Sequence, residues 1–275
     1  MPERHDPRGA APGNTEHRSL FGGVPRRLWR LIALAHRRLL MLDHDGTLAP
    51  FETERDRAVP STRSLLQLGR LAASSGTRLA IVSGRPVREL DPHLGRLGVT
   101  LVGEHGWERR EPGGELVRDR MPDAARQALD RADRAVTDPA IRARLEVKRT
   151  SIALHTRGLE YEEAEHAGRA VRAAWRPHES KGVLRTVPFA GGFELRAAER
   201  DKGTAVKALM AEEPPGTLAV YVGDDLTDED AFEAVRDRGF GLRVGAPDGA
   251  TSATAWLGDM EEVTEFLAEW LSIAG

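Results

Sequence analysis

The stretch Leu39-Leu40-Met41-Leu42-Asp43-His44-Asp45-Gly46-Thr47-Leu48 decides the fold of this chain. Four apolar residues run into two carboxylates spaced two residues apart, and a glycine turn follows. An apolar run of this length that ends in a turn predicts a buried central strand of a parallel sheet. Reactive groups of such sheets gather at the carboxyl ends of the strands. We therefore expect Asp43 on that rim and Asp45 in the loop above it, where a divalent cation would offset their mutual repulsion. The alternative is a short acidic loop that caps a helix or faces solvent.

Length and composition narrow the class of protein. The 275 residues suffice for one large domain or two smaller ones, and we expect two. A formal net charge of −3 gives no overall attraction to nucleic acid or to an anionic membrane, so an anionic ligand needs a local site. The absence of cysteine excludes disulfides, thiolate metal sites and cysteine nucleophiles. No apolar run approaches the roughly 18 residues of a membrane span, and the start of the chain lacks the pattern of a signal peptide. We expect a soluble, cytoplasmic protein.

Strands and helices alternate along most of the chain. Residues 1–22 are rich in Pro, Gly, Arg and His and are expected to form a disordered leader. Buried strands are expected at residues 39–42, 77–82, 99–102, 218–222 and 241–244. Helices are expected at 24–38, from Pro60 to about 76, from Pro86, and at 202–210, 228–237 and 261–272. This alternation predicts βαβ units and a doubly wound, mostly parallel α/β sheet.

The pattern changes between residues 109 and 198. Pro112-Gly113-Gly114 and Ala190-Gly191 each predict a hairpin turn. Helical stretches near 122–136 and 159–175 are separated by one strand-like run at 145–156. We expect this segment to be a compact α+β cap, inserted between a first part of the core at 23–108 and a second part at 199–275.

Polar groups follow four strand ends or helix starts. They are Asp43 with Asp45, Ser83, Lys202, and the acidic run Asp224, Asp225 and Asp228. Each has an ordinary structural explanation when taken alone: Ser83 as a helix cap before Pro86, Lys202 as a solvated lysine, the aspartates as a turn or a favourable first helical turn. The expected fold brings all four groups to one rim, which favours a shared site.

In this order the four groups resemble the four motifs of the haloacid dehalogenase superfamily of phosphohydrolases. The runs Ser-Gly-Arg at 83–85, Asp-Lys-Gly at 201–203 and Gly-Asp-Asp-Leu-Thr-Asp-Glu-Asp at 223–230 resemble, more narrowly, those of trehalose-6-phosphate phosphatases. The resemblance covers about residues 38–270. It implies a Rossmann-like core with an α+β cap, and a Mg²⁺-dependent enzyme of trehalose biosynthesis that hydrolyses trehalose 6-phosphate through an aspartyl-phosphate. It also implies functional pairing with a trehalose-phosphate synthase-like glycosyltransferase.

The residues suit phosphoryl transfer, which needs a nucleophile, countercharge on the phosphoryl oxygens and a proton donor for the leaving oxygen. Asp43 is the expected nucleophile. Asp45 can protonate the sugar oxygen and later accept a proton from water. Ser83 can donate a hydrogen bond to a phosphoryl oxygen, and Lys202 can neutralise charge shared by Asp43 and phosphate.

The same acidic groups suit Mg²⁺, which prefers oxygen ligands in octahedral geometry. We expect Asp43, the backbone carbonyl of Asp45, and Asp224 as protein ligands. Asp225 and Asp228 are expected behind them, where they would hold waters or Lys202.

The cap is expected to select the substrate, because the rim contacts only phosphate. Strand alternation puts Glu146 and Lys148 on one face, and Glu194 on the matching face of a later strand. If the apolar residues between them pack on the cap helices, these three side chains point toward the rim and can bind sugar hydroxyls. The positions Glu146, Lys148, Ser151 and His155, followed by Glu194, resemble the family's Glu-x-Lys-x-x-Ser-x-x-x-His and Glu patterns. A solvated polar sheet face is the alternative, and His155 is as readily explained by a structural role.

Two further residues have open roles. His105, followed by Gly106, resembles another family signature and would steady the cap hinge or contact sugar. Arg85 would clamp either a neighbouring carboxylate or the substrate.

Two departures from the family pattern leave the sugar open. His44 follows Asp43 where an aromatic or aliphatic residue is commoner, and the segment before Lys202 lacks the usual Pro and Asn. A related phosphorylated disaccharide or pseudo-disaccharide is therefore an alternative substrate. A sugar phosphotransferase or phosphomutase, and a non-catalytic sugar-phosphate sensor, are the other functions considered.

Overall fold

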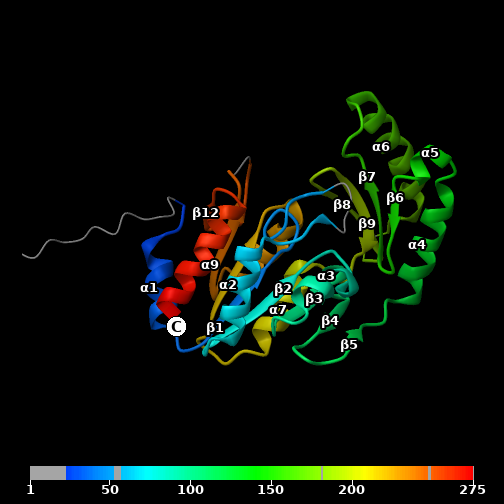
Figure 1. The fold of residues 1–275 in the computed structure, drawn as a ribbon. Coiled ribbons are helices and arrows are strands. Elements are labelled where there is room, and N and C mark those ends of the chain that lie inside the picture. Colours follow the sequence, from blue (N-terminus) through cyan, green and yellow to red (C-terminus); the bar gives the residue numbers. More distant parts are fainter. Residues whose placement is uncertain (1–22, 53–56, 181, 247–248, 275) are drawn as a thin grey trace, which may run out of the picture.

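A computed structural model describes residues 23–52, 57–180, 182–246 and 249–274. The prediction of a disordered leader at residues 1–22 lies outside them. Figure 1 shows two separate sheets with helices packed on them. Within the described residues, no helix combines the length and the apolar character that a membrane span requires.

The large sheet has eight strands in the order β12-β11-β10-β1-β2-β3-β4-β5. All strands from β12 to β3 are parallel, and β4 and β5 add an antiparallel hairpin at one edge. The bounds are β1 Arg38–Leu42, β2 Thr77–Val82, β3 Thr100–Gly103, β4 Glu108–Arg110, β5 Leu116–Arg118, β10 Leu218–Gly223, β11 Gly239–Val244 and β12 Ala255–Leu257. This arrangement confirms the predicted doubly wound core.

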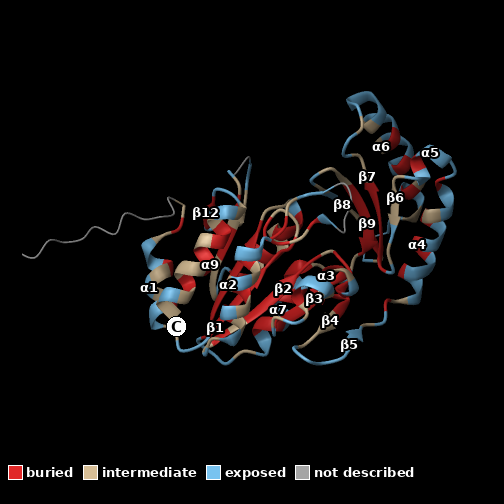
Figure 2. Ribbon diagram, viewed as in Figure 1, coloured by how far each residue is buried: buried red, intermediate tan, exposed pale blue. Residues whose placement is uncertain are grey.

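Strand β1 is the centre of the sheet and is buried along its whole length. Leu40 and Leu42 pack on one face of the sheet, and Leu39 and Met41 pack on the other. Helices α1 (Arg26–Leu34), α2 (Thr62–Ala73), α3 (Val87–Leu94) and α9 (Met260–Ala274) supply the first core, and α7 (Lys202–Ala211) and α8 (Glu229–Val235) supply the second. Figure 2 shows the resulting buried layers. A strand covered on both faces needs no polar alternation, which is why its sequence is a continuous apolar run.

The smaller sheet has four antiparallel strands in the order β6-β7-β9-β8. They are β6 Leu145–Val147, β7 Ser151–His155, β8 Leu184–Phe189 and β9 Gly192–Ala197. Helices α4 (Asp123–Ala135) and α6 (Tyr161–Trp175) pack on it and share a core of their own, in which the ring of Trp175 meets that of Phe193 edge-on at 5.4 Å. A short helix α5 (Pro139–Arg142) precedes β6.

Three details differ from the sequence-based expectations. The run at 145–156 is not one strand but the hairpin β6–β7, closed by a bond from the Lys148 amide to the Ser151 carbonyl at 2.8 Å. Val147 is 58% exposed, so this residue does not pack on the helices as expected. The hairpin around Gly113 exists as predicted, but its first strand, β4, pairs with β3, so the hairpin extends the large sheet although it was expected in the cap.

The register of the parallel strands aligns their carboxyl ends. Leu42 of β1 lies opposite both Ile81 of β2 and Val222 of β10. The amide of Asp43 continues the pattern by donating to the Val222 carbonyl at 2.8 Å, and the Ser83 amide donates to the Val102 carbonyl at 2.9 Å. The residues that follow these strands therefore meet at one edge of the sheet.

Candidate active site

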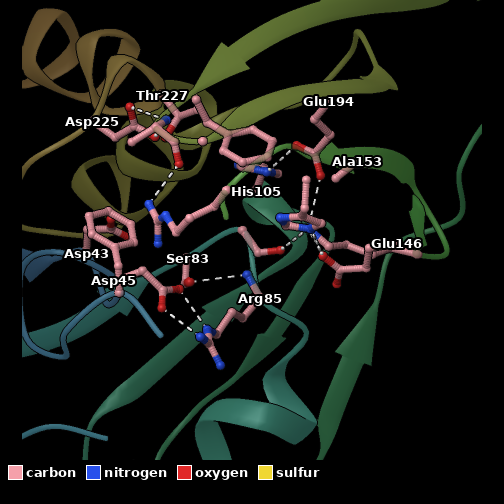
Figure 3. Close-up of a pocket in the computed structure, with 18 of the residues that line it drawn as sticks. Asp43, Asp45, Ser83, Arg85, His105, Glu146, Ala153, Glu194, Asp225 and Thr227 are labelled. Atoms are coloured by element: carbon pink, nitrogen blue, oxygen red, sulfur yellow. Dashed lines mark hydrogen bonds and ion pairs between the residues drawn. The ribbon is translucent and has the colours of Figure 1, made fainter. Parts of the chain in front are cut away.

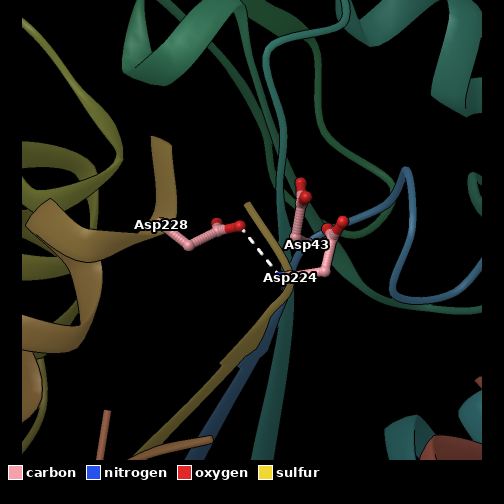
Figure 4. A group of neighbouring side chains, drawn as sticks. All are labelled: Asp43, Asp224 and Asp228. Carbon is pink, nitrogen blue, oxygen red and sulfur yellow. Dashed lines mark hydrogen bonds between the residues drawn. The ribbon is translucent and has the colours of Figure 1, made fainter. Parts of the chain in front are cut away.

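A cavity of about 470 Å³ lies between this edge and the smaller sheet (Figure 3). Its lining includes most of the residues that the sequence selected: Asp43, Asp45, Ser83, Arg85, His105, Glu146, Lys148, His155, Glu194, Lys202 and Asp225. Asp224 and Asp228 lie beside Asp43 (Figure 4). The structure thus brings every predicted site residue to one place.

Lys202 is held between two carboxylates. Its ammonium lies 2.9 Å from an oxygen of Asp43 and 2.8 Å from one of Asp228, and only 3% of the side chain is exposed. Burial by itself would lower the pKa of Lys202, but the charges of Asp228 and Asp43 outweigh it and raise the pKa. Lys202 opens helix α7, whose start is fixed by a capping box between Asp201 and Thr204. The lysine is therefore a fixed positive charge beside Asp43.

Asp228 is fully buried and both of its oxygens are occupied. Oδ1 accepts from Lys202 and from the Tyr221 hydroxyl, and Oδ2 accepts from the amides of Asp224 and Asp225 at 3.1 and 3.0 Å. A carboxylate with this many donors has little capacity left for a metal ion. Its contacts instead orient Lys202, one of the two roles expected for it.

Asp43 and Asp224 form the part of the acidic cluster that a cation fits. Carboxylate oxygens of Asp43, Asp224 and Asp228 all lie within 4.8 Å of one another. Burial and the charge of Asp228 raise the pKa of Asp224 to about 8, and burial also raises that of Asp43. A Cβ built on Gly46 would lie 2.1 Å from an Asp224 oxygen, so a glycine is required where this carboxylate approaches the turn. Buried, mutually repelling oxygens beside the Lys202 ammonium are the donor set that a hard divalent cation satisfies.

Asp45 turns its side chain toward Arg85. The guanidinium donates two hydrogen bonds of 2.7 Å, one to each carboxylate oxygen of Asp45. The Nδ1 atom of His44 lies 3.5 Å from Oδ1 of Asp45. Burial would raise the pKa of Asp45, but His44 and Arg85 outweigh it and hold the pKa well below its usual range. Of the two roles considered for Arg85, the structure shows the contact with a neighbouring carboxylate, that of Asp45.

Ser83 is buried, and its hydroxyl oxygen accepts a bond from the Arg85 amide at 3.1 Å. It does not cap the following helix, because α3 has Pro86 at its N-cap position and no side-chain cap bond. The explanation of Ser83 as a helix cap therefore does not apply.

Glu194 anchors the part of the cavity formed by the smaller sheet. Its carboxylate accepts bonds from Ser151 at 2.7 Å and Lys148 at 3.0 Å, and it contacts Nε2 of His105 at 2.9 Å. Burial would raise the pKa of Glu194, but Lys148 and His105 outweigh it and hold the pKa well below the usual value.

The contacts of His105 fix its charge and tautomer. Glu194 can only accept at Nε2, and Arg196 can only donate to Nδ1, from which its guanidinium lies 3.3 Å. The ring therefore carries its proton on Nε2 and is neutral, in agreement with burial, which lowers its pKa to about 4. Sequence reasoning placed His105 here but gave no role to Arg196, although strand alternation puts Arg196 on the same face of β9 as Glu194.

The outer part of the cavity contains a second acid–histidine pair. Nε2 of His155 lies 2.9 Å from Glu146, and the rings of His155 and Phe189 are 5.5 Å apart. The Arg157 guanidinium stacks over the Phe51 ring at 4.4 Å, which joins the smaller sheet to the loop after β1. Phe51 and Arg157 carried no signal in the sequence, because neither belongs to a motif.

The contact with Lys202, one of the two roles expected for Asp225, is made by other carboxylates. The Asp225 carboxylate accepts from the amide of Leu226 at 2.7 Å and from that of Ala190, in the β8–β9 turn, at 3.2 Å. It therefore caps the 3₁₀ turn Leu226–Asp228 and contacts the smaller sheet, and Lys202 is held by Asp43 and Asp228.

Comparison with known proteins shows which family this chain resembles. A sequence model described as trehalose-phosphatase matches residues 41–256. The bifunctional trehalose-6-phosphate synthase/phosphatase of Thermoproteus tenax is 36% identical over 240 residues, which cover 86% of this chain and 32% of that protein. The trehalose-6-phosphate phosphatase of Escherichia coli is 32% identical over 226 residues, which cover 82% and 83% of the two chains. This chain spans only 63% of the trehalose-phosphate phosphatase of Mycobacterium marinum.

Solved structures agree with the fold. The C-terminal domain of the C. albicans trehalose-6-phosphate phosphatase has a TM-score of 0.78 at 22% identity, covering 92% of this chain and 98% of that one. A haloacid dehalogenase-like hydrolase from Bacteroides thetaiotaomicron has a TM-score of 0.57 at 16% identity, covering 84% and 98%. These likenesses confirm the expected haloacid dehalogenase-like fold.

Proposed function

The chain belongs to the trehalose-phosphatase family, and from this premise we propose that it hydrolyses trehalose 6-phosphate to trehalose and phosphate. The observation that carries the proposal is the buried group Asp43, Lys202 and Asp224 at the floor of the cavity. It combines a carboxylate nucleophile, a fixed positive charge and a place for a cation, which are the parts that phosphoryl transfer needs.

In the first step an oxygen of Asp43 attacks phosphorus and the bond between phosphorus and the sugar oxygen breaks. Asp45 gives its proton to the departing oxygen. In the second step an oxygen of water attacks phosphorus while the bond between phosphorus and the Asp43 oxygen breaks, a proton of the water passes to Asp45, and phosphate leaves with the Asp43 carboxylate restored. Arg85 holds Asp45 in its ionised form, which suits the second step, so the first step requires this contact to be given up.

Lys202 and Ser83 act on the phosphoryl oxygens. The ammonium neutralises charge that Asp43 shares with the phosphoryl group, and the hydroxyl donates a hydrogen bond to one oxygen. Mg²⁺ bound by Asp43, Asp224 and the Asp45 carbonyl would supply further charge neutralisation. Asp228 keeps Lys202 in place, because it is the second carboxylate on the ammonium.

We propose that the smaller sheet supplies the sugar site and that, with helices α4 and α6, it acts as a substrate-selecting cap. Glu146, Lys148, His155 and Glu194 line the cavity and offer both donors and acceptors to sugar hydroxyls. His105 binds Glu194 and so orients it. A related phosphorylated pseudo-disaccharide would use the same groups, which makes the choice of sugar a question for experiment.

The test is a phosphate-release panel of trehalose 6-phosphate, glucose 6-phosphate and other phosphorylated mono- and disaccharides, with and without Mg²⁺. We expect release from trehalose 6-phosphate to exceed that from glucose 6-phosphate by far and to need the cation. Asp43→Asn should abolish turnover while the fold is retained, and Glu194→Ala should chiefly raise KM. Equal rates on both sugars would overturn the disaccharide specificity, and full activity of Asp43→Asn would overturn the mechanism.

We also propose that the enzyme works in the cytoplasm beside a trehalose-phosphate synthase-like glycosyltransferase. The name of the Thermoproteus tenax relative joins a synthase and a phosphatase in one protein, which supports this pairing. Release of trehalose from a mixture of the two enzymes and the synthase substrates is the corresponding measurement.

A further inference from the structure

Glu104 and His105, directly after β3, have an unusual backbone. Both are in the left-handed region, with φ of 47° and 55°, although neither is glycine. This conformation is unfavourable for residues with a Cβ and persists only where surrounding contacts enforce it. Two such residues in succession therefore indicate a segment whose shape is held from more than one side.

The backbone of this pair holds the loop that contains Ser83. The Glu104 amide donates to the Arg85 carbonyl at 2.9 Å, and the His105 amide donates to the Ser83 carbonyl at 3.0 Å. A Cβ on Gly84 would lie 2.7 Å from the His105 ring, so the loop and the imidazole are in close contact. The left-handed pair thus fixes the position of the phosphate-facing loop.

The Glu104 side chain points to the smaller sheet. Only 2% of the residue is exposed, and Oε2 accepts from the Thr150 hydroxyl at 3.1 Å and lies 3.1 Å from the Arg149 guanidinium. Arg149 and Thr150 form the β6–β7 turn. Burial raises the pKa of Glu104 and Arg149 partly offsets this, so the carboxylate depends on that turn for its countercharge.

Lys148 is the residue immediately before Arg149 and Thr150. Its ammonium lies 3.0 Å from Glu194 and 3.4 Å from the carbonyl of Gly84, so it reaches both the sugar-binding side and the phosphate-facing loop. Arg149 is further tied to the large sheet by bonds to the carbonyls of Trp107 and Asp119 at 3.3 and 3.0 Å. The turn is therefore a fixed point between the two sheets, and Lys148 extends from it over the cavity.

We propose that Glu104 is a positioning residue: its contacts with Arg149 and Thr150 set Lys148 and Glu194 at the distance from Ser83 that a sugar phosphate requires. The proposal rests on the proposed function, because it concerns how that site recognises the sugar. A phosphate ester without a sugar does not need Lys148 or Glu194. The role of Glu104 is therefore specific to sugar phosphates.

The chain offers a matched control in Glu108. It is also buried, at 3% exposure, and also accepts two bonds, from the Val87 amide and the Arg118 guanidinium, each at 2.8 Å. Val87 begins helix α3 and Arg118 ends strand β5, so both partners belong to elements of the large sheet and its helices. Glu108→Gln thus removes a buried charge of the same kind without touching the β6–β7 turn.

The experiment measures kcat and KM of Glu104→Gln, Thr150→Val and Glu108→Gln with trehalose 6-phosphate and with p-nitrophenyl phosphate, together with their melting temperatures. For the first two variants we expect kcat/KM for trehalose 6-phosphate to fall by about tenfold, the worth of a hydrogen bond to a charged group. We expect the rate with p-nitrophenyl phosphate to stay within about twofold. Glu108→Gln should lower the melting temperature and leave the ratio between the two substrates unchanged.

The deciding quantity is kcat/KM for trehalose 6-phosphate divided by kcat/KM for p-nitrophenyl phosphate. The proposal is overturned if this ratio is unchanged in both Glu104→Gln and Thr150→Val, or if it changes equally in Glu108→Gln. Thr150→Val keeps it open to refutation if Glu104→Gln does not fold. The wild-type panel decides the proposed substrate separately. If another sugar phosphate proves best, the ratio is formed with that compound, so the role of Glu104 can fail or hold independently.

Discussion

Replacing Asp228 with asparagine tests whether the buried charges beneath the cavity stabilise the fold. The side chain is fully buried and accepts four hydrogen bonds, from Lys202, from Tyr221 and from two backbone amides. Asparagine has one acceptor oxygen, and its amide nitrogen is a donor. Whichever way the amide is turned, two of the four donors lose their acceptor and face another N–H group.

The magnitude follows from two opposing effects. Breaking a buried ion pair by removing one partner costs about 3–5 kcal/mol. Against this, removing the charge of Asp228 relieves repulsion on Asp43 and Asp224, whose pKa values it raises; this relief is worth about 1 kcal/mol at the effective dielectric of such sites. We therefore expect the free energy of unfolding to fall by about 3 kcal/mol, or the melting temperature by about 6–12 °C.

Asp225→Asn is the control, because it makes the same chemical change three residues away. Asp225 caps a helical turn, and asparagine is as good a cap as aspartate, so the expected loss is a few tenths of a kcal/mol. Both variants are unfolded in urea with a chelator present, and circular dichroism gives the midpoints. If the two differ by less than about 1 kcal/mol, the pair of Lys202 and Asp228 adds no net stability and the reasoning fails.

Three further predictions concern stability, pH and metal. Tyr221→Phe should lower the free energy of unfolding by about 1–3 kcal/mol in the same urea assay, because Asp228 loses the hydroxyl that donates to it; an unchanged midpoint would contradict this. Hydrogen bonds from Arg109 lower the pKa of Glu212 from 4.5 to about 2, so this group stabilises the fold above pH 4.5 and loses that effect as the pH falls toward 2. Glu212→Gln should therefore flatten the fall of melting temperature between about pH 5 and pH 2, and parallel curves would refute it. Asp224→Asn should raise the Mg²⁺ concentration for half-maximal phosphate release by about tenfold or more, whereas an unchanged requirement would place the cation elsewhere.

The large sheet could be predicted because local sequence and global fold agree there. The run from Leu39 to Leu42 can be satisfied only by burial on both faces, and the structure has helices on both sides of it. Once the strands are parallel, geometry brings the residues after them together, so the sequence alone predicts Asp43 and Ser83 on one rim.

The hairpin β6–β7 could not be predicted in the same way. The turn at Lys148, Arg149 and Thr150 contains neither glycine nor proline, the usual signals of a turn. What stabilises it is tertiary: Arg149 and Thr150 bind Glu104, which is 45 or more positions away in the sequence. The local sequence pattern contains no sign of such distant partners, so it predicts one strand where the structure has two.

Asp225 shows a different limit. It is adjacent to Asp224 and shares its charge, and sequence reasoning gave it a share in holding waters or Lys202. Asp225 lines the cavity, but it is the N-cap of a 3₁₀ turn and its carboxylate accepts from amides at 2.7 and 3.2 Å, while Asp43 and Asp228 hold Lys202. Chemical type thus predicts which residues reach a site, but the local backbone determines which partners they bind there.

The charges of the cavity floor bear on the proposed role of a cation. Among the described residues, the carboxyl groups of Asp43, Asp45, Asp224 and Asp228 outnumber the cationic side chains of Arg85 and Lys202 beside them. Both cations are already engaged by these carboxylates, and the chain as a whole is also negative, at −3. Burial raises the pKa of Asp43 and of Asp224, so the ionised form of these two groups is disfavoured there. A divalent cation at Asp43 and Asp224 would favour their ionised forms and would also offset the charge of an incoming phosphate. Arg85 and Lys202 hold the proposed acid–base group and nucleophile, so under the proposed mechanism such a cation would add to the neutralisation that Lys202 supplies.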